Sequence, residues 1–466
     1  MQGINHYQPH LFVYVNLEDL IPQKHILRKI DKIFDLSFVR KLTAKYYCST
    51  NGRPSIDPEL FFRMILVGYI FGIKHDRRLC EDITCNIAYR WYCKLNLDDN
   101  VPDHSSLSKI RDRYGEDVFK EFFDEVIEIC KKYGLVKGEK IITDSTLIEA
   151  NASIDSMEAI STKENKEDIH FKEKLSNKTH KSKSDPDSSL AQKRGQARKL
   201  RYKVHTCIDG DSRVILDNKL TTGCLHESNI FIDQIEKIKR KYNLPIEEVI
   251  ADRAYGSADN LLTLKKQGIT TFIPLFSTRV GKISDMENYD FRYDQQKDVY
   301  ICPRGKHLTR REQNKNWVVY RSKSKDCNEC SEKDACIAPK SNKGYNLRKI
   351  MRSIYQNFYE KEKSRMKEKA FIEKLQERMW KIEGIIAEAK QFHCLARAKY
   401  RGLKKVQIQS YMIGATQNLK RVLSCLNPTT YLCVLLKLLH IIKKEFSSKN
   451  LIKLIMEKYR LLENIT

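Results

Sequence analysis

The apolar pattern of this chain changes from helical to alternating at Lys140. Before that point, apolar residues recur every three or four positions, as they do on the buried face of a helix. The segment KIITDSTLIEA then alternates and is rich in β-branched residues, which predicts a strand. Asp144 lies in the middle of this strand, where an uncompensated carboxylate is costly to desolvate. We therefore expect a helical part joined to a sheet that carries an acidic residue.

Residues 1–135 are predicted to form an all-α domain. Asp57 followed by Pro58 marks the start of one helix, and the sequence after it, LFFRMILVGYIFGI, is apolar on most sides. This helix is expected at the centre of a small bundle. After a polar break at Pro102, the segments SSLSKIRDRY and EDVFKEFFDEVIEICKKYG predict a short and a longer helix.

Short helices around a tight break resemble a helix-turn-helix arrangement. The candidate DNA-binding side chains on the helix after the break are Lys109, Arg111 and Arg113. An ordinary bundle with a solvated basic face explains the same pattern equally well. The whole chain carries 85 Lys and Arg against 60 Asp and Glu, a net charge of +25. Such a surplus indicates a polyanionic partner and favours the DNA-binding interpretation.

Residues 136–280 predict the first part of an α/β domain. Two alternating strands flank the pair Asp209-Gly210, which suits a tight hairpin turn. An amphipathic helix, a short strand ending at Asp252, a second helix and the strand TTFIPL follow. This order describes a mixed sheet with flanking helices. Within it, residues 157–199 have few apolar side chains and are expected to be a flexible insertion.

Residues 281–345 predict a loop-rich insertion with four cysteines spaced C-x24-C-x2-C-x5-C, namely Cys302, Cys327, Cys330 and Cys336. This spacing is close to that of a four-thiolate zinc site. Unmetallated thiols are the alternative, but the region has little apolar material to hold it together, which favours a structural Zn²⁺. The other ten cysteines stand at scattered apolar positions and are expected to be small core residues.

The rest of the chain is predicted to be helical. Residues 346–425 would close the α/β domain, and residues 426–466 would form C-terminal helices. No apolar run reaches the roughly 18 residues of a membrane span, and the start of the chain does not resemble a signal peptide. We therefore expect a cytoplasmic protein with no membrane partner.

Two acidic residues in or at the end of apolar strands, Asp144 and Asp252, are candidates for metal binding. Together with a third acid from a packing helix, they could hold two divalent ions about 4 Å apart, an arrangement used in phosphodiester chemistry. Mg²⁺ is the expected ion, with Mn²⁺ as a substitute. A single Asp in a strand is more often hydrogen-bonded for structural reasons, and this remains the alternative for each residue taken alone.

The sequence resembles the DDE transposases of bacterial insertion sequences, specifically the insertion sequence 1182 group. The similar stretches follow the family's order along nearly the whole chain. They are GRPSIDPELFFRMILVGYIFGI, YRWYCKLNLDDNVPDHSSLSKIR, ITDSTLIEANAS, SDPDSSLAQKRGQARKLRYKVHTCID, HESN, VIADRAYGS, YICPRGKHL, KIEGIIAEAK and RGLKKVQ.

The resemblance implies a helical N-terminal domain before a ribonuclease H-like catalytic domain. It implies that Asp144, Asp252 and Glu383 are the catalytic, Mg²⁺-binding acids and that Lys390 contacts DNA phosphate. Gln376 and Met379 stand where related transposases have Tyr and Arg, so Arg378 is assigned no role.

Helix geometry separates the acids near the end of the chain. Seven residues are two helical turns, so Glu383 and Lys390 are expected on one face. Glu388 is turned by roughly 140° from Glu383 and is expected to face solvent.

The function implied by the resemblance is transposition. Such a protein binds the terminal inverted repeats of its element, cuts there and joins the freed 3′ hydroxyl to target DNA, usually as a homodimer that pairs two ends. It would act in the bacterial cytoplasm, at the nucleoid. The alternatives are a ribonuclease H-like nuclease without strand transfer and a DNA-binding regulator with an inactive catalytic domain. The presence of all three acids argues against the regulator.

Overall fold

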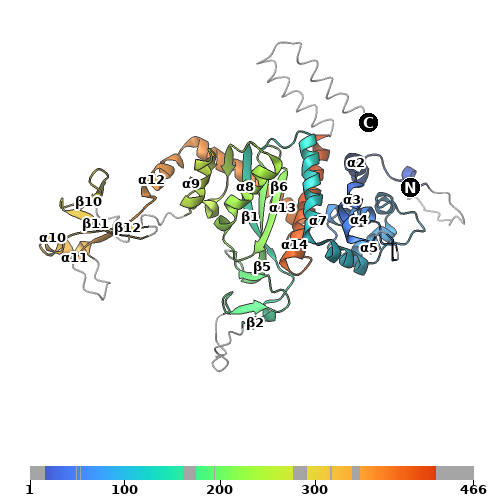
Figure 1. Ribbon diagram of the computed structural model, residues 1–466, viewed down its shortest axis with the longest axis horizontal. Helices are drawn as coiled ribbons and strands as arrows, with labels where there is room; N and C mark the ends of the chain where they lie inside the picture. Colours follow the sequence, from blue (N-terminus) through green and yellow to red (C-terminus); the bar gives the residue numbers. More distant parts are fainter. Residues whose placement is uncertain are drawn as a thin grey trace, which may run out of the picture. The chain divides into compact units, whose positions relative to one another are not determined.

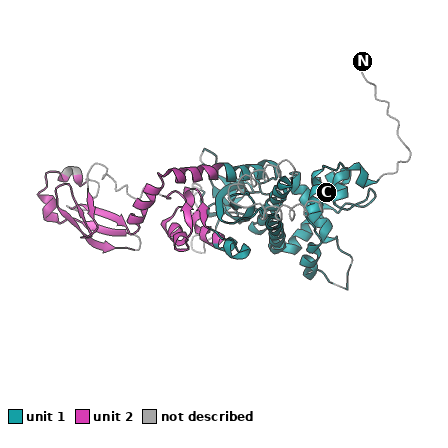
Figure 2. Cartoon of the chain, turned by 90° about the horizontal axis from the view of Figure 1, so that it is seen from above, with its two compact units in different colours: residues 1–225, 236–246, 380–466 teal, residues 226–235, 247–379 magenta. Residues whose placement is uncertain are grey.

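The computed structural model describes residues 16–160, 175–276, 291–337 and 347–426, apart from residues 49, 53, 194, 315 and 316. The chain divides into two compact units (Figure 2). Unit 1 comprises residues 1–225, 236–246 and 380–466, and unit 2 comprises residues 226–235 and 247–379. Unit 1 thus contains the N-terminal helices together with much of the α/β part.

The N-terminal part of unit 1 is helical, as predicted. The Asp57 side chain accepts a hydrogen bond from the backbone N–H of Glu59, and Pro58 occupies the first turn, so the central helix α4 begins where the sequence indicated. Ten of its thirteen residues are buried, as expected for a helix at the centre of a bundle. The helices are α1 (Leu17–Leu20), α2 (Ile26–Ile33), α3 (Phe38–Thr43), α4 (Pro58–Ile70), α5 (Asp76–Cys85), α6 (Ile87–Tyr92) and α7 (His104–Lys132).

Helix α7 contains the break that the sequence indicated between a short and a long helix. Gly115 adopts φ 65°, a left-handed conformation that interrupts the helix and suits glycine. The longer second part packs along α14 (Leu403–Cys425), where Phe123 stacks on Tyr411 with ring centroids 5.7 Å apart (Figure 1). Aromatic stacking of buried rings adds to the apolar burial that joins the N-terminal helices to the rest of unit 1.

The sheet of unit 1 is built around one long strand that has antiparallel neighbours on both sides. Strand β1 (Lys140–Glu149) pairs with β5 (Lys199–Asp209), and β5 pairs with β6 (Ile215–Thr222) and with the short β4 (Ser189–Ala191). The predicted turn is present, because the Asp209 carboxylate accepts hydrogen bonds from the backbone N–H groups of Asp211 and Ser212. Helix α14 covers β6 through Gln407 and Asn418, whose side chains bond to strand backbone.

The expectation of a flexible insertion over residues 157–199 is wrong for much of that stretch. Residues 161–174 lie outside the described residues, but β2 (Met157–Ala159) pairs with β3 (His180–Ser182). Asp185 is fully buried and accepts hydrogen bonds from the Tyr202 hydroxyl at 2.5 Å and the Gly402 backbone at 2.9 Å. Both bonds go to the same carboxylate oxygen. The polar composition misled because this part of the chain is ordered by polar contacts with distant residues and not by an apolar core of its own.

Unit 2 holds the remaining part of the predicted α/β order and the insertion. Strand β7 (Glu248–Ile250) pairs in parallel with β8 (Thr270–Phe272), and α9 (Ala258–Lys266) connects them. With α8 (Phe231–Tyr242) before β7, the order strand, hairpin, helix, strand, helix, strand is the predicted one. The α/β class is therefore confirmed.

The insertion in unit 2 is a five-stranded antiparallel sheet in the order β13-β12-β11-β10-β9. Its core contains Tyr300, Leu308, Val318, Tyr320 and Ile350, so it has more apolar packing than the sequence led us to expect. Its elements are β9 (Arg292–Asp294), β10 (Val299–Ile301), β11 (His307–Gln313), β12 (Trp317–Arg321), α10 (Ser324–Asn328), α11 (Lys333–Cys336) and β13 (Lys349–Ser353).

Three long helices follow the insertion, as predicted for residues 346–425. They are α12 (Gln356–Arg365), α13 (Lys369–Phe392) and α14. The predicted C-terminal helices at 426–466 lie outside the described residues, except for residue 426. No helix in the described part of the chain is long and apolar enough to cross a membrane.

Candidate active site

Asp144 lies halfway along β1, opposite Thr206 of β5. The neighbouring Thr143 is completely buried and donates its hydroxyl to the Thr206 carbonyl. Because successive side chains of a strand point to opposite faces, Asp144 lies on the face opposite Thr143. Asp144 is only partly buried, and one of its oxygens accepts the Ser145 backbone N–H at 2.7 Å. The pairing of β1 with β5 thus fixes the backbone of this acid, and its side chain stays partly exposed.

Glu383 lies on the exposed side of α13, in unit 1. The opposite side of the helix is anchored by Ile382 and Ile385, which are buried, and by Gln417 of α14, whose amide donates to the Ile385 carbonyl at 2.9 Å. Lys381 donates to the Gly210 carbonyl in the hairpin turn. These contacts hold α13 against the sheet of unit 1 with the Glu383 carboxylate outward.

Glu388 does not face solvent, contrary to the prediction. Its side chain is 17% exposed and forms ion pairs with Lys420 at 2.7 Å and Arg421 at 2.6 Å, both on α14. Burial alone would raise the pKa of Glu388, but hydrogen bonds from His393 and Lys420 and the charge of Arg421 bring it far below its usual range. The prediction that Glu383 and Glu388 lie on different sides of α13 is confirmed. Glu388 links α13 to α14 through its two ion pairs.

Asp252 follows β7 in unit 2 and caps a 3-10 turn by accepting the Ala254 backbone N–H at 3.0 Å. Burial raises the pKa of Asp252 above its ordinary value, in spite of the Ala254 hydrogen bond and the charge of Arg378, and the nearby charge of Glu227 raises it further. Arg378, which the sequence left without a role, is therefore an electrostatic neighbour of this acid.

Glu227 and His226 belong to the surroundings of Asp252 and were missed as site residues. Both act electrostatically on its ionisation, Glu227 raising and His226 lowering the pKa of Asp252. Asn260 holds the two turns together, because its amide donates to the carbonyls of Ser228 at 3.2 Å and Tyr255 at 3.1 Å. The HESN stretch was the available signal in the sequence. Asp252, the acid that Glu227 influences, lies 25 residues further along the chain, so their proximity could not be predicted.

The donor chemistry of these residues suits a divalent cation. Carboxylate oxygens are the ligands that Mg²⁺ prefers. Asp252 is partly buried, and no described cation forms an ion pair with it, so a bound metal would offset its desolvation. As the described side chains stand, no group of three or more His, Cys, Asp or Glu is arranged to hold a metal ion.

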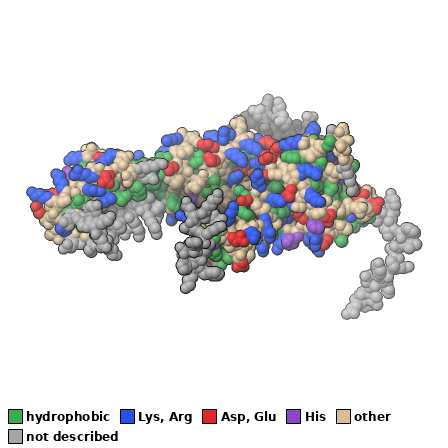
Figure 3. Space-filling view, turned by 60° about the horizontal axis from the view of Figure 1, so that its bottom comes forward, with side chains coloured by type: hydrophobic (Ala, Val, Ile, Leu, Met, Phe, Trp, Pro, Cys, Tyr) green, Lys and Arg blue, Asp and Glu red, His purple; other side chains and the backbone are tan. Residues whose placement is uncertain are grey.

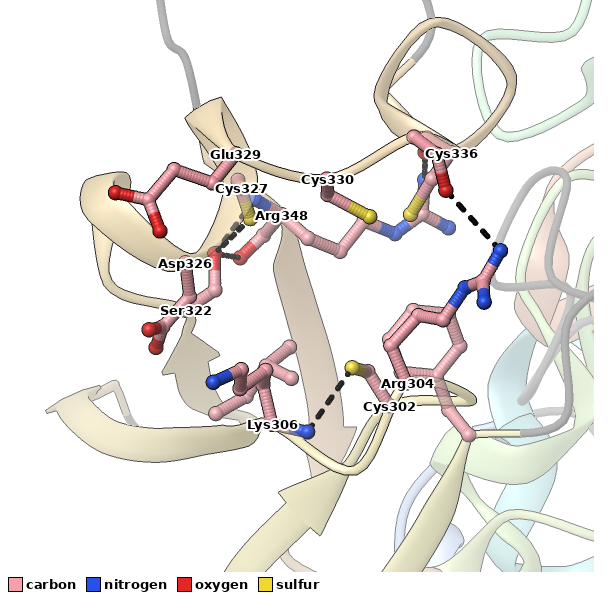
Figure 4. A pocket seen from close by; sticks show the side chains of 13 residues that line it. Cys302, Arg304, Lys306, Ser322, Asp326, Cys327, Glu329, Cys330, Cys336 and Arg348 are labelled. Carbon is pink, nitrogen blue, oxygen red and sulfur yellow. Dashed lines mark hydrogen bonds between the residues drawn. The ribbon is translucent and has the colours of Figure 1, made fainter.

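The four cysteines of the insertion line one pocket of about 260 Å³ in unit 2 (Figure 4). Cys302 accepts the Lys306 backbone N–H at 3.3 Å, and Cys327 lies 3.0 Å from the Ser322 hydroxyl. Arg348 donates to the Cys336 carbonyl. Burial raises the pKa of Cys336, and the other three thiols raise it further while Arg348 lowers it. Residues separated by up to 34 positions are thus brought together, with a cation beside them.

The remaining cysteines only partly match the expectation of core residues. Cys93, Cys130 and Cys207 are buried, but three others are exposed, namely Cys48, Cys85 and Cys224. An apolar neighbour in the sequence does not determine whether a cysteine is buried, so the exposure of these three thiols could not be predicted.

The three basic candidates on α7 differ in their surroundings. Lys109 and Arg113 are exposed. Arg111 is 3% exposed, forms an ion pair with Asp76 at 2.7 Å and stacks over the Tyr400 ring at 4.3 Å. Its guanidinium is engaged inside unit 1, so the prediction that Arg111 contacts DNA is wrong.

The α/β fold thus carries one acid in a strand, one after another strand and one on a closing helix. The model of the family described as "Transposase DDE domain" matches residues 137–419, and that described as "Transposase domain (DUF772)" matches residues 15–113. The chain therefore belongs to the DDE transposases. The ribonuclease H-like fold and the enzyme class predicted from the sequence are confirmed.

Among solved structures, the chain is similar to a piggyBac transposase in a synaptic complex with hairpin DNA, with 11% identity over 86% of this chain and 82% of that one and a TM-score of 0.26. It is also similar to the Mos1 transposase paired-end complex with the left transposon end, with 7% identity over 48% of this chain and 61% of that one and a TM-score of 0.17. Likenesses this weak add no argument to the family match. No curated protein matches the sequence.

Proposed function

We propose that this transposase binds the terminal inverted repeats of an insertion sequence, cuts the DNA there and joins the freed 3′ hydroxyl to target DNA. Asp144, Asp252 and Glu383 would be the catalytic acids. The observation that carries this proposal is that all three acids fall within residues 137–419, the part of the chain that the transposase DDE domain model matches, each on a different element of the α/β fold.

The proposed cofactor is a pair of Mg²⁺ ions, for which Mn²⁺ would substitute. When bound, the metal supplies Lewis acidity to the scissile phosphate and to the attacking oxygen. The protein's own contribution is positioning. The β1–β5 pairing fixes Asp144, the capped turn fixes Asp252, and the anchored face of α13 presents Glu383. Water would attack in the cutting step, and the 3′ hydroxyl would attack in the joining step.

The proposed DNA contacts outside the acids involve Lys390, Lys109 and Arg113. Lys and Arg side chains are spread over much of the face drawn in Figure 3, as a protein that follows a phosphate backbone requires. Pairing of two element ends calls for a homodimer, which we include in the proposal. Action on a bacterial element implies a cytoplasmic protein at the nucleoid.

We also propose that the insertion binds one structural Zn²⁺ through Cys302, Cys327, Cys330 and Cys336. The shared pocket, the backbone N–H bonded to Cys302 and the guanidinium of Arg348 suit four thiolates around Zn²⁺, which carry a net negative charge. The metal would tie α10 and α11 to the β10–β11 turn.

The experiment that tests the function uses the purified full chain and a duplex bearing the element's terminal repeat, found in the DNA that flanks the reading frame. An uncut end tests cleavage, and a precut end with a free 3′ hydroxyl tests joining to a plasmid. The proposal predicts Mg²⁺-dependent cutting of the first and integration of the second. Degradation of the precut end without integration would instead identify a nuclease of the same fold.

A further inference from the structure

A polar pocket of about 540 Å³ in unit 1 lies at the C-terminal end of α13. Its walls come from the turn between α4 and α5, from Asn151 two residues after β1, from the last turn of α13 and from the segment that follows this helix. The lining residues are Gly72, Lys74, His75, Asn151, Lys390, Gln391, Cys394, Ala396, Arg397, Ala398 and Lys399. We call it the Lys390 pocket. It brings the N-terminal helices and the catalytic part of unit 1 to one site.

The lining of the Lys390 pocket is cationic. It includes four Lys or Arg side chains and one His but no Asp or Glu. Throughout the described ranges, no carboxylate forms an ion pair with Lys74, Lys390 or Arg397. Burial lowers the pKa of Lys390, and the charges of Lys193 and Arg201 lower it further. The carboxylate of Glu149 is close enough for the charge of Arg397 to lower its pKa, but it is paired with Lys199 at 2.6 Å. The positive charges that line the pocket therefore outnumber the acids near it and favour an anionic ligand.

The walls of the pocket are held in place before any ligand binds. Gly72 has φ 66°, and a Cβ atom there would lie 2.5 Å from the Phe392 carbonyl oxygen, so only glycine fits the turn. The Lys399 ammonium donates to the Ile73 carbonyl at 2.6 Å. Ala398 donates its backbone N–H to the Glu149 carbonyl at 2.8 Å, which fixes the segment that carries Arg397. A preorganised cationic pocket loses little entropy on binding an anion.

We propose that the Lys390 pocket binds a backbone phosphate of the DNA strand beside the bond that is cut, with Lys74 and Arg397 as ligands in addition to Lys390. This inference rests on the proposed function. Lys390 lies seven residues after Glu383 on α13, which is roughly 10 Å along a helix axis. At 3.4 Å per nucleotide along one strand of a duplex, that distance corresponds to about three nucleotides. The α4–α5 turn of the N-terminal helices therefore takes part in holding DNA at the active site.

The test is the salt dependence of DNA binding by the full chain, measured by fluorescence anisotropy without divalent metal. The probe is the duplex with the element's terminal repeat. The double variant Lys74→Gln/Arg397→Gln changes two exposed side chains that make no ion pair among the described residues. The matched control, Lys132→Gln/Arg240→Gln, removes the same charges from two exposed positions of unit 1 outside the pocket.

The pocket variant is expected to bind roughly tenfold or more weakly near physiological salt. The slope of log K against log salt should fall in magnitude by up to about 0.9, the value expected for the loss of one phosphate contact. The control variant should keep the wild-type slope. An unchanged slope in the pocket variant, or an equal loss in the control, would overturn the proposal.

Two further measurements distinguish DNA phosphate from inorganic phosphate as the ligand, and failure of the pocket assignment from failure of the proposed function. Ethylation of single phosphates should interfere with wild-type binding about three nucleotides from the cut, and the pocket variant should be insensitive to ethylation there. Wild-type DNA binding competed equally well by inorganic phosphate and by duplex, at equal phosphate concentration, would contradict a DNA site. If the wild type cuts element ends and the pocket variant binds normally, only the pocket assignment fails. If the wild type neither binds nor cuts them, the proposed function fails.

Discussion

The Glu388 carboxylate on α13 accepts a hydrogen bond from the Arg421 guanidinium on α14 over 2.6 Å. Lys420 bonds to the other oxygen, and the buried His393 lies 3.6 Å from it. This cluster fixes the rotation of α13 between Glu383 and Lys390. Glu388 is thus a structural residue. The exposed Glu383, five residues earlier on the same helix, remains the candidate catalytic acid.

Glu388→Gln is expected to destabilise the fold at pH 7 by about 3 kcal/mol, because it leaves Lys420 and Arg421 partly buried without their counter-charge. The pKa of Glu388 is lowered in the folded state, so its stabilisation is present above the unfolded pKa of about 4.3 and is lost as pH falls below it. Urea unfolding of both proteins across pH should show a gap at neutral pH that closes in acid. A constant gap would contradict the ion-pair account.

Local periodicity predicted the elements of this fold well, because it depends only on neighbouring residues. The helix break at Gly115 and the hairpin at Asp209 are examples. The errors concern polar groups whose partners are distant in the sequence. Arg111 meets Tyr400, and Asp185 meets Tyr202 and Gly402. The neighbours of Asp252 were missed for the same reason, since no spacing rule relates a turn to another turn.

Asp252→Asn is expected to abolish cleavage and to raise the melting temperature. The pKa of Asp252 is raised in the folded state, so its charged form opposes folding at pH values above that pKa. A neutral amide removes this cost. Mg²⁺ should raise the melting temperature of the wild type and leave that of the variant nearly unchanged, because only a metal that binds the folded state stabilises it.

The matched comparison for that measurement is Asp294→Asn, which removes a partly buried carboxylate that accepts two backbone N–H groups at the end of β9 in the insertion. It should keep the response to Mg²⁺. Equal Mg²⁺ stabilisation of the wild type and the Asp252 variant would show that the metal binds elsewhere.

The insertion is expected to contain one Zn²⁺ per chain by elemental analysis. Cys327→Ser/Cys330→Ser should lose the metal and expose the insertion to protease, because two of four ligands are gone. Cys48→Ser/Cys85→Ser, which changes two exposed thiols outside the pocket, should keep it. A metal-free wild type with a protease-resistant insertion would refute the zinc site.

Arg111 and Lys109 are expected to behave in opposite ways although they are two residues apart on α7. Arg111→Gln breaks the buried pair with Asp76 and should cost about 3 kcal/mol of folding free energy. Lys109→Gln should leave stability unchanged and weaken binding of element-end DNA. Thermal unfolding and anisotropy on both variants check this. A stable Arg111 variant with weak DNA binding would restore it to the DNA surface.

The central claim is that Asp144, Asp252 and Glu383 act together in Mg²⁺-dependent DNA cleavage. The most direct measurement is cutting of the element-end duplex by the wild type, Asp144→Asn, Asp252→Asn and Glu383→Gln at DNA concentrations that saturate binding. Glu373→Gln is the control, since Glu373 is exposed on the same helix and its pair with Lys369 is 3.8 Å long between exposed side chains. We predict that each of the three variants binds DNA but cuts at least about 10³-fold more slowly, while the control cuts at the wild-type rate. Wild-type cleavage by any of the three in Mg²⁺ would contradict the account.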